Sequence, residues 1–120
     1  MKLILKRSQA DVTGFLGGHK GVSFNLHCKS EVTSEERLMI DRYKIGDQVL
    51  ASYNRKIGDS GKDFKVTISV YDLINGKDIQ MEEIGTMLEL EESIKQGTKK
   101  LKEILKAMQS FGGEEEIIID

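Results

Sequence analysis

The sequence predicts an α+β fold: a mainly antiparallel sheet of about five to six strands with one short and one long helix packed on one face. Two observations predict it. Apolar and polar residues alternate strictly at 22–29 and at 64–71, a pattern typical of half-buried strands. Apolar residues at 86–111 recur with the period of an amphipathic helix. The 120 residues fit one domain, 1–120, with a single core.

The first half of the chain is expected to contain three strands and the short helix. Thr33, followed three residues later by Glu36, is a capping box and predicts a helix that begins there. Gly46 suits the left-handed residue after a last helical turn, so the helix is expected to end near it. The expected strands are 2–7, 22–28 and 48–53, and residues 55–63 are expected to form an exposed loop.

The second half is expected to contain a hairpin. Asn75-Gly76 is the strongest short-range hairpin signal, because a type I′ turn needs positive φ at both central residues. The turn would join a strand at 64–71 to a return strand at 77–83. Phe64, Val66, Ile68 and Val70 would then face the core, with Met81 opposite Val70.

The long helix should follow this hairpin. Thr86 and Glu89 form a second capping box, which places the start of the helix at Thr86. Gly112-Gly113 is expected to end it, and residues 114–120, with three consecutive isoleucines, are expected to form a last strand.

The apolar stripe of this helix predicts a homo-oligomer, most simply a dimer. Residues 86–111 would span about 39 Å as a helix, more than the ~30 Å width of a small domain, so part of the stripe should overhang its own sheet. A glycine in mid-helix costs roughly 1 kcal/mol, so Gly97 predicts a close backbone approach by a strand or a second helix. The expected interface residues are Met87, Leu90, Ile94, Gly97, Leu101, Ile104, Leu105 and Met108.

Composition excludes several functional classes. A net charge of −2, with the acidic residues concentrated in the second half, argues against a general nucleic-acid binder, which needs a basic surface. Apolar runs are too short for a membrane span, and the first residues do not resemble a signal peptide. One cysteine permits no internal disulfide and indicates a reducing compartment such as the cytoplasm. Proline is absent, so no edge strand is protected by it.

We identify no catalytic residues, metal ligands or cofactor motif. His27 and Cys28 are adjacent in an alternating strand and so point to opposite faces, which prevents a dyad. Cys28 is expected to be buried and inert, and His27 to be solvated on the polar face. The loop at 58–62 has neither the spacing of a phosphate-binding loop nor the scaffold of a serine protease.

The glycine-rich segment 14–21 allows two interpretations. Its four glycines let the backbone approach a ligand closely, and His19 and Lys20 add positive charge. Gly17, Gly18, His19 and Lys20 could therefore bind a small anion such as a phosphate or nucleotide. The simpler interpretation is a connection between the first two strands.

Lysines are numerous in the second half of the long helix. They could form a patch that binds an acidic partner, or they could simply stabilise the helix and keep the protein soluble.

The function we expect is a small non-enzymatic interaction or regulatory protein that acts as a homo-oligomer and binds a macromolecular partner, most simply a protein. Compact chains without motifs are common among accessory proteins of phages and mobile elements. The alternative is a protein that binds or sequesters a small anionic ligand at 14–21.

Overall fold

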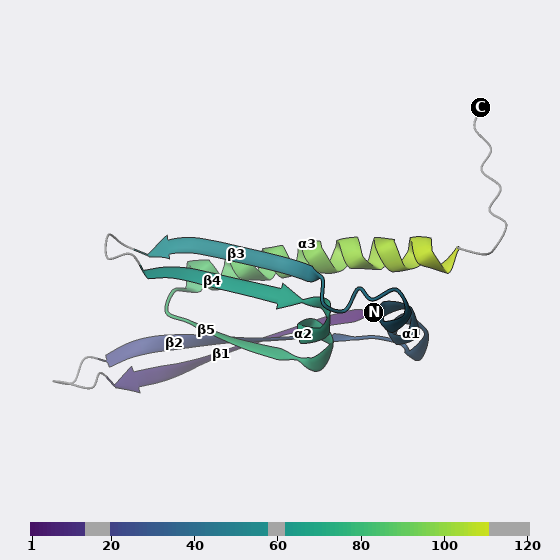
Figure 1. Cartoon of the computed structure of the whole chain (residues 1–120). Helices are drawn as coiled ribbons and strands as arrows, with labels where there is room; N and C mark the ends of the chain where they lie inside the picture. The colour runs from purple at the N-terminus through teal and green to yellow at the C-terminus, as the bar shows by residue number, and fades with distance from the viewer. Residues whose placement is uncertain (14–19, 58–61, 111–120) are drawn as a thin grey trace, which may run out of the picture.

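The computed structural model describes residues 1–13, 20–57 and 62–110, and Figure 1 shows how they are arranged. Five strands and three helices form in this part of the chain. In order they are β1 (Lys2–Thr13), β2 (Lys20–Glu31), α1 (Ser34–Arg42), β3 (Val49–Ile57), β4 (Lys62–Ser69), α2 (Val70–Asn75), β5 (Lys77–Met81) and α3 (Ile84–Gln109).

The strands form two antiparallel sheets instead of the single predicted sheet. One has the order β1-β2-β5 and the other consists of β3 and β4. The Lys77 Nζ of β5 donates to the Thr67 carbonyl of β4 at 3.3 Å, so a side chain joins the two sheets where a continuous ladder was expected. The prediction of an α+β fold with antiparallel strands is confirmed, and the single sheet is wrong.

The predicted hairpin at Asn75-Gly76 is also wrong. Ser69 and Asp72 form a reciprocal capping box, which ends β4 and begins α2 at Val70. Gly76 has the positive φ that was expected, 90°, but it follows a helix. β5 then pairs with β2, so Met81 lies opposite Phe24.

The core-facing residues of β4 were predicted correctly. Ile68 is fully buried, and Phe64 and Val66 are partly buried against the same cluster, while Thr67 is exposed. Val70 is buried as well, although it belongs to α2. The alternation of apolar residues therefore indicated the buried face, whereas the strand partner depended on a contact distant in sequence.

α1 begins as predicted and ends differently. The Glu36 amide donates to Thr33 Oγ1 at 3.1 Å, and the Thr33 amide donates to Glu36 Oε1 at 2.9 Å. The left-handed residue after the helix is Lys44, with a φ of 55°. Gly46 has another role, since a Cβ there would lie 2.0 Å from the Tyr71 ring.

α3 starts two residues before the predicted Thr86. Glu83 is its N-cap and makes no side-chain cap hydrogen bond. Thr86 lies inside the helix, where its hydroxyl accepts from Arg55 Nη1 at 3.1 Å. Glu89 is bonded to the Tyr53 hydroxyl, so the predicted capping box does not form.

The close approach predicted at Gly97 is confirmed. A Cβ on Gly97 would lie 2.2 Å from the carbonyl oxygen of Leu50. Leu50 falls between Val49 and Ala51, where the β3–β4 register shifts. A bulge of this kind redirects backbone groups, and here the backbone of β3 contacts α3 at Gly97, a position without a side chain.

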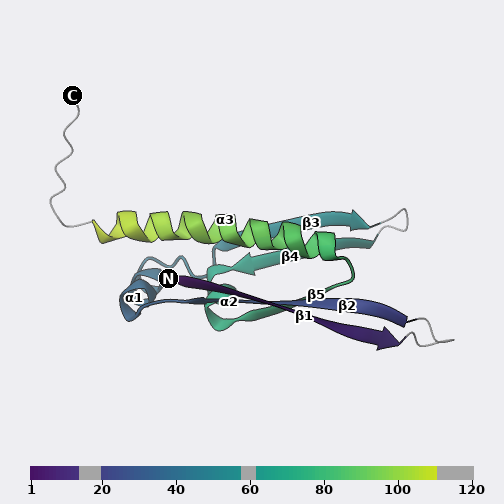
Figure 2. The same ribbon diagram turned by 180° about the vertical axis from the view of Figure 1, so that it is seen from behind.

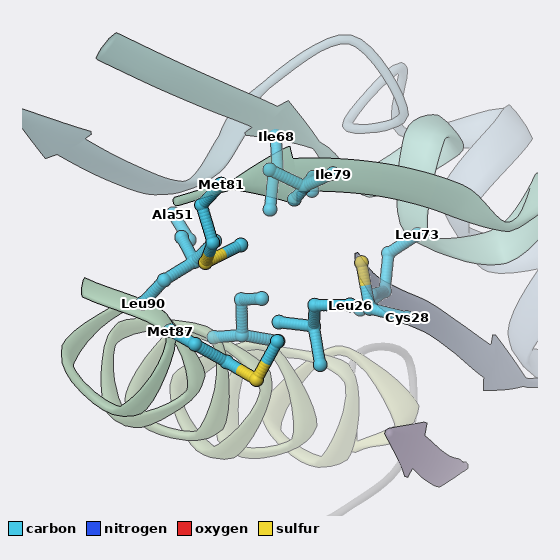
Figure 3. Packing of buried hydrophobic residues seen from close by; sticks show 10 residues of the cluster. Leu26, Cys28, Ala51, Ile68, Leu73, Ile79, Met81, Met87 and Leu90 are labelled. Atoms are coloured by element: carbon cyan, nitrogen blue, oxygen red, sulfur yellow. The ribbon is translucent and has the colours of Figure 1, made fainter. Parts of the chain in front are cut away.

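The core lies between α3 and the two sheets, as Figure 3 shows for Leu26, Met81 and Leu90. Both hairpins run toward the same end of an elongated molecule (Figures 1 and 2). We call this end, with the first turn of α3 and the hairpin ends β1–β2 and β3–β4, the open end. The opposite end, with α1, α2 and the last turns of α3, is the closed end.

Two predictions lie outside the described residues: the glycine end of the long helix, at 112–113, and the final strand at 114–120. Of the loop predicted at 55–63, β3 continues to Ile57 and β4 begins at Lys62. Within the described ranges, no helix has the length and apolar character that a membrane span requires.

Candidate binding site at the open end

Two hollows flank the first turn of α3. The first, which we call the acidic hollow, has a volume of about 300 Å³ and lies between β4, the end of β5 and α3. The second, the arginine hollow, has a volume of about 240 Å³ and lies between β1, β2 and α3. The acidic hollow is lined by Asp63, Phe64, Gln80, Met81, Glu82, Glu83 and Thr86. The arginine hollow is lined by Arg7, Ser8, Gln9, Phe24, Ile84 and Met87.

Apolar side chains connect the two hollows. Phe24 and Met81 are direct cross-strand partners in β2 and β5, and each lines one hollow. Phe64 packs edge-on against Tyr53, with the ring centroids 6.0 Å apart. Ile84 is 56% exposed beside Phe24 and Met87, at the start of α3. Each hollow thus has apolar residues in its lining, and Ile84 is the most exposed of them.

Carboxylates surround the acidic hollow. Glu83 Oε2 lies 3.3 Å from Arg55 Nη1, which also donates to Thr86. Asp63 and Glu82 form no ion pair with any other side chain of the described segments. Burial raises the pKa of the Tyr53 phenol, and the adjacent Glu89 carboxylate raises it further. The hollow therefore carries negative charge beside an apolar floor.

A buried ion pair forms one wall of the arginine hollow. Glu91 is only 3% exposed, and its carboxylate accepts from Arg7 Nε at 2.7 Å and from Arg7 Nη2 at 2.5 Å. The hydrogen bond and the charge of Glu91 raise the pKa of Arg7. Because one partner is buried, the pair fixes β1 against α3 and leaves the outer side of the guanidinium at the surface.

The sequence predicted neither the hollows nor this pair, although one signal was present. Arg7 follows Leu3 and Leu5 at every second position of β1, so its side chain points to the same face as theirs, and theirs pack on the core. Glu91 lies on the apolar stripe, four residues after Met87 and three before Ile94. One charge on each of two buried faces, with opposite signs, is the pattern that could have indicated a pair.

His27 and Cys28 lie on opposite faces, as predicted. Cys28 is fully buried, and burial raises the pKa of its thiol. His27, which we expected to be merely solvated, has its Nδ1 2.8 Å from Asp78 Oδ1, and Asn25 Nδ2 donates to the same oxygen at 3.3 Å. These hydrogen bonds lower the pKa of Asp78, with His27 the larger cause. The pairing of β5 with β2 creates this cluster, which is why the sequence did not indicate it.

The predicted anion site falls mostly outside the described residues. Gly17, Gly18 and His19 are not described, and Lys20 is the first residue of β2. Thr13, the last residue of β1, pairs with Lys20. Among the described residues, no group of three His, Cys, Asp or Glu side chains is arranged to hold a metal ion.

Most of the predicted interface is covered by the chain itself. Gly97 contacts Leu50, Ile104 is 36% exposed, and Met108 is half-buried. The buried members are Met87, Leu90, Ile94, Leu101 and Leu105. The two sheets and α1 therefore cover the stripe that we expected a second copy to cover.

Comparison of the chain with protein-family models, curated proteins and solved structures finds no match in any of the three.

Proposed function

We propose that this is a non-enzymatic binding protein that holds a macromolecular partner, most simply a protein, at the open end. The observation that carries the proposal is the apolar floor of the two hollows. Ile84 is more than half exposed in the arginine hollow, which the partly buried Phe24 also lines, and the partly buried Phe64 lines the acidic hollow. Exposed apolar surface with a polar rim is typical of interaction sites.

The acidic hollow indicates the chemistry of the partner. Its floor includes Phe64 and Met81, and its rim carries Asp63, Glu82 and Glu83. An apolar side chain flanked by lysine or arginine would bury its apolar part on this floor and pair its charges with the rim. We therefore propose a partner segment that is both apolar and basic.

Two further parts of the proposal have separate support. A homo-oligomer would use surfaces other than the buried stripe, such as Val49 and Ile104, which line one groove. A free buried thiol at Cys28 suits a reducing compartment such as the cytoplasm.

The alternative is that a small anion such as a phosphate or nucleotide binds at 14–21. A thermal-shift screen of phosphate compounds and nucleotides tests it, with the double variant His19→Ala/Lys20→Ala as control. Stabilisation that the double variant abolishes would favour the alternative over a macromolecular partner.

The proposed function is tested with two labelled peptides of equal length, one alternating lysine with leucine and the other alternating glutamate with leucine. Fluorescence anisotropy should show binding of the lysine peptide, and the double variant Asp63→Lys/Glu82→Lys should weaken it by about tenfold, because each lost surface pair contributes up to ~1 kcal/mol. Glu31→Lys/Glu35→Lys, two exposed carboxylates near the closed end, should leave binding unchanged. Equal affinity for the two peptides, or equal effects of the two double variants, would overturn the proposal.

A further inference from the structure

α1 carries an exposed apolar side chain on the face opposite to the one that packs on the core. Leu38 is 69% exposed, which makes it the most exposed large apolar side chain of the described residues. Ile40, on the other face, is fully buried and holds the helix to the rest of the closed end. A single exposed leucine is ordinary, so its surroundings decide whether this surface binds anything.

A groove lies beside Leu38, between α1 and the last turns of α3. It has a volume of about 240 Å³, and we call it the closed-end groove. Met39 and Met108 are half-buried and supply apolar lining, and the flexible side chain of methionine adapts to what it contacts. The groove can therefore take up an apolar side chain. The full lining is Glu35, Leu38, Met39, Arg42, Tyr43, Met108 and Gln109.

Two opposite charges flank Leu38 on α1. Glu35 precedes it by three residues and Arg42 follows it by four, a spacing that places all three on one helix face. Both charged side chains are exposed, and neither forms an ion pair with another described residue. The Arg42 guanidinium lies 5.8 Å from the centroid of the Tyr43 ring, which lines the same groove. This face of α1 thus carries, in order, an acid, an apolar residue and a base.

This order is self-complementary. When two copies of α1 lie antiparallel about a two-fold axis between positions 38 and 39, Glu35 faces the partner's Arg42 and Leu38 faces the partner's Met39. Glu35 and Arg42 are about 10.5 Å apart along the helix, at ~1.5 Å per residue, in both copies, so the two ion pairs form together. Leu38 of each copy then lies over the closed-end groove of the other. A two-fold contact of this kind uses one patch twice and closes on itself.

The three other hollows of the described chain are not self-complementary, because each is lined by charged residues of a single sign. The groove with Val49 and Ile104 carries Lys100, the arginine hollow carries Arg7, and the acidic hollow carries three carboxylates. Two copies of any of these hollows would bring like charges together, which costs free energy. Charge therefore favours α1 as the surface that a second copy covers.

We infer that two copies of the chain associate through α1 about a two-fold axis, with Glu35 paired to the partner's Arg42 and Leu38 seated on the partner's closed-end groove. The inference rests on the homo-oligomer of the proposed function and names its surface. Because α1 lies at the closed end, the open ends of both copies stay accessible to a macromolecular partner (Figures 1 and 2).

Exchange of the two charges tests the inference, by analytical ultracentrifugation of the full chain. The contact is small, since α1 is only ~13.5 Å long, so the dimer should form in a concentration-dependent way over about 5–500 µM. Glu35→Arg and Arg42→Glu should each weaken self-association by at least about tenfold, because each places like charges opposite one another twice. The double variant Glu35→Arg/Arg42→Glu should restore it, and so should an equimolar mixture of the two single variants, because opposite charges then face each other again.

Two apolar substitutions locate the contact. Leu38→Asp should abolish the dimer and leave the urea unfolding of the dilute protein unchanged, since the exposed Leu38 does not belong to the core. Val49→Asp changes an exposed apolar residue at another groove and should leave the dimer intact.

Three results would overturn the inference. A wild-type chain that stays monomeric over the whole range forms no such dimer, and a double variant that associates no better than the single variants forms no such ion pairs. Dissociation by Val49→Asp but not by Leu38→Asp would keep the homo-oligomer and place it at the other groove. Binding of the lysine–leucine peptide is measured at the open end, so it tests the macromolecular partner of the proposed function independently of all three.

Discussion

The two ends of the molecule use their side chains differently. At the closed end, α1 and α2 each begin with a reciprocal capping box, and two glycines are placed where a Cβ would collide with Tyr71 or Leu50. At the open end, α3 begins without a side-chain cap, and Ile84 and Leu88 stay about half exposed. Exposed apolar side chains occur at both ends, since Leu38 of α1 is 69% exposed. The ends differ in how their helices begin and in the two hollows that flank the first turn of α3 at the open end.

The largest expected effect concerns the glycines of α3. Gly97→Ala should destabilise the protein by about 3 kcal/mol, because a Cβ 2.2 Å from the Leu50 carbonyl oxygen forces β3 or α3 to move. Helix propensity alone predicts the opposite sign, a gain of about 1 kcal/mol. Urea unfolding monitored by circular dichroism measures the difference.

The matched control is Gly85→Ala, in the first turn of α3. Its Cβ would approach nothing closer than Arg55 Nη1 at 3.8 Å, so it should be neutral or stabilising by up to about 1 kcal/mol. If both alanines stabilise the protein, the close contact between α3 and β3 is not present in solution.

Truncation of an apolar side chain should lower the free energy of unfolding more at the closed end than at the open end. Leu101→Ala should cost about 2–3 kcal/mol, because Leu101 is buried in the cluster with Ile40 and Leu105. Ile84→Ala should change stability by less than about 0.5 kcal/mol, since that side chain is largely exposed. If the two variants lose the same free energy of unfolding, measured by thermal or urea unfolding, the two ends do not differ in this way.

Helix caps give a smaller effect. Thr33→Ala should cost about 1 kcal/mol by removing the cap of α1. At the open end, Glu83→Ser should stabilise the protein by about 0.5 kcal/mol, because it supplies the cap that α3 lacks. A loss at Glu83 as large as the loss at Thr33 would show that α3 is already capped.

The smallest expected effect is on the pH dependence of stability. The Ser69 amide donates to Asp72 at 3.0 Å and, with Lys77 adding its charge, lowers the pKa of that carboxyl below its ordinary value. A lowered pKa means that the stabilisation is complete above the unfolded value of about 3.9 and is lost as pH falls through the folded value. Asp72→Asn should therefore flatten the stability profile below about pH 4, as urea unfolding at a series of pH values would show; an unchanged acid slope would contradict this.

Local signals in the sequence predicted local structure. The Thr33 box, the buried face of β4, the burial of Cys28 and the close approach at Gly97 all follow from residues within one element. The hairpin at Asn75-Gly76 failed because the Ser69–Asp72 box, equally local, began a helix first.

The candidate site could not be predicted in the same way. It depends on β5 pairing with β2, about 50 positions earlier in the chain, and on Arg7 reaching Glu91. No spacing within a single element encodes these contacts. The homo-oligomer stays a prediction. The sequence showed the stripe of α3, but not that the chain itself would bury Met87, Leu90, Ile94, Leu101 and Leu105.

The methionine ε-methyl groups can show whether an apolar and basic partner binds at the open end or at the closed end. Met81 and Met87 line the two hollows, whereas Met39 and Met108 line a groove at the closed end and serve as internal controls. In a titration with the lysine–leucine peptide followed by ¹H–¹³C NMR, we expect saturable shifts of the Met81 and Met87 methyl signals and no change in those of Met39 and Met108. Shifts confined to Met39 and Met108, or no shift of any methyl at saturating peptide, would contradict binding at the open end.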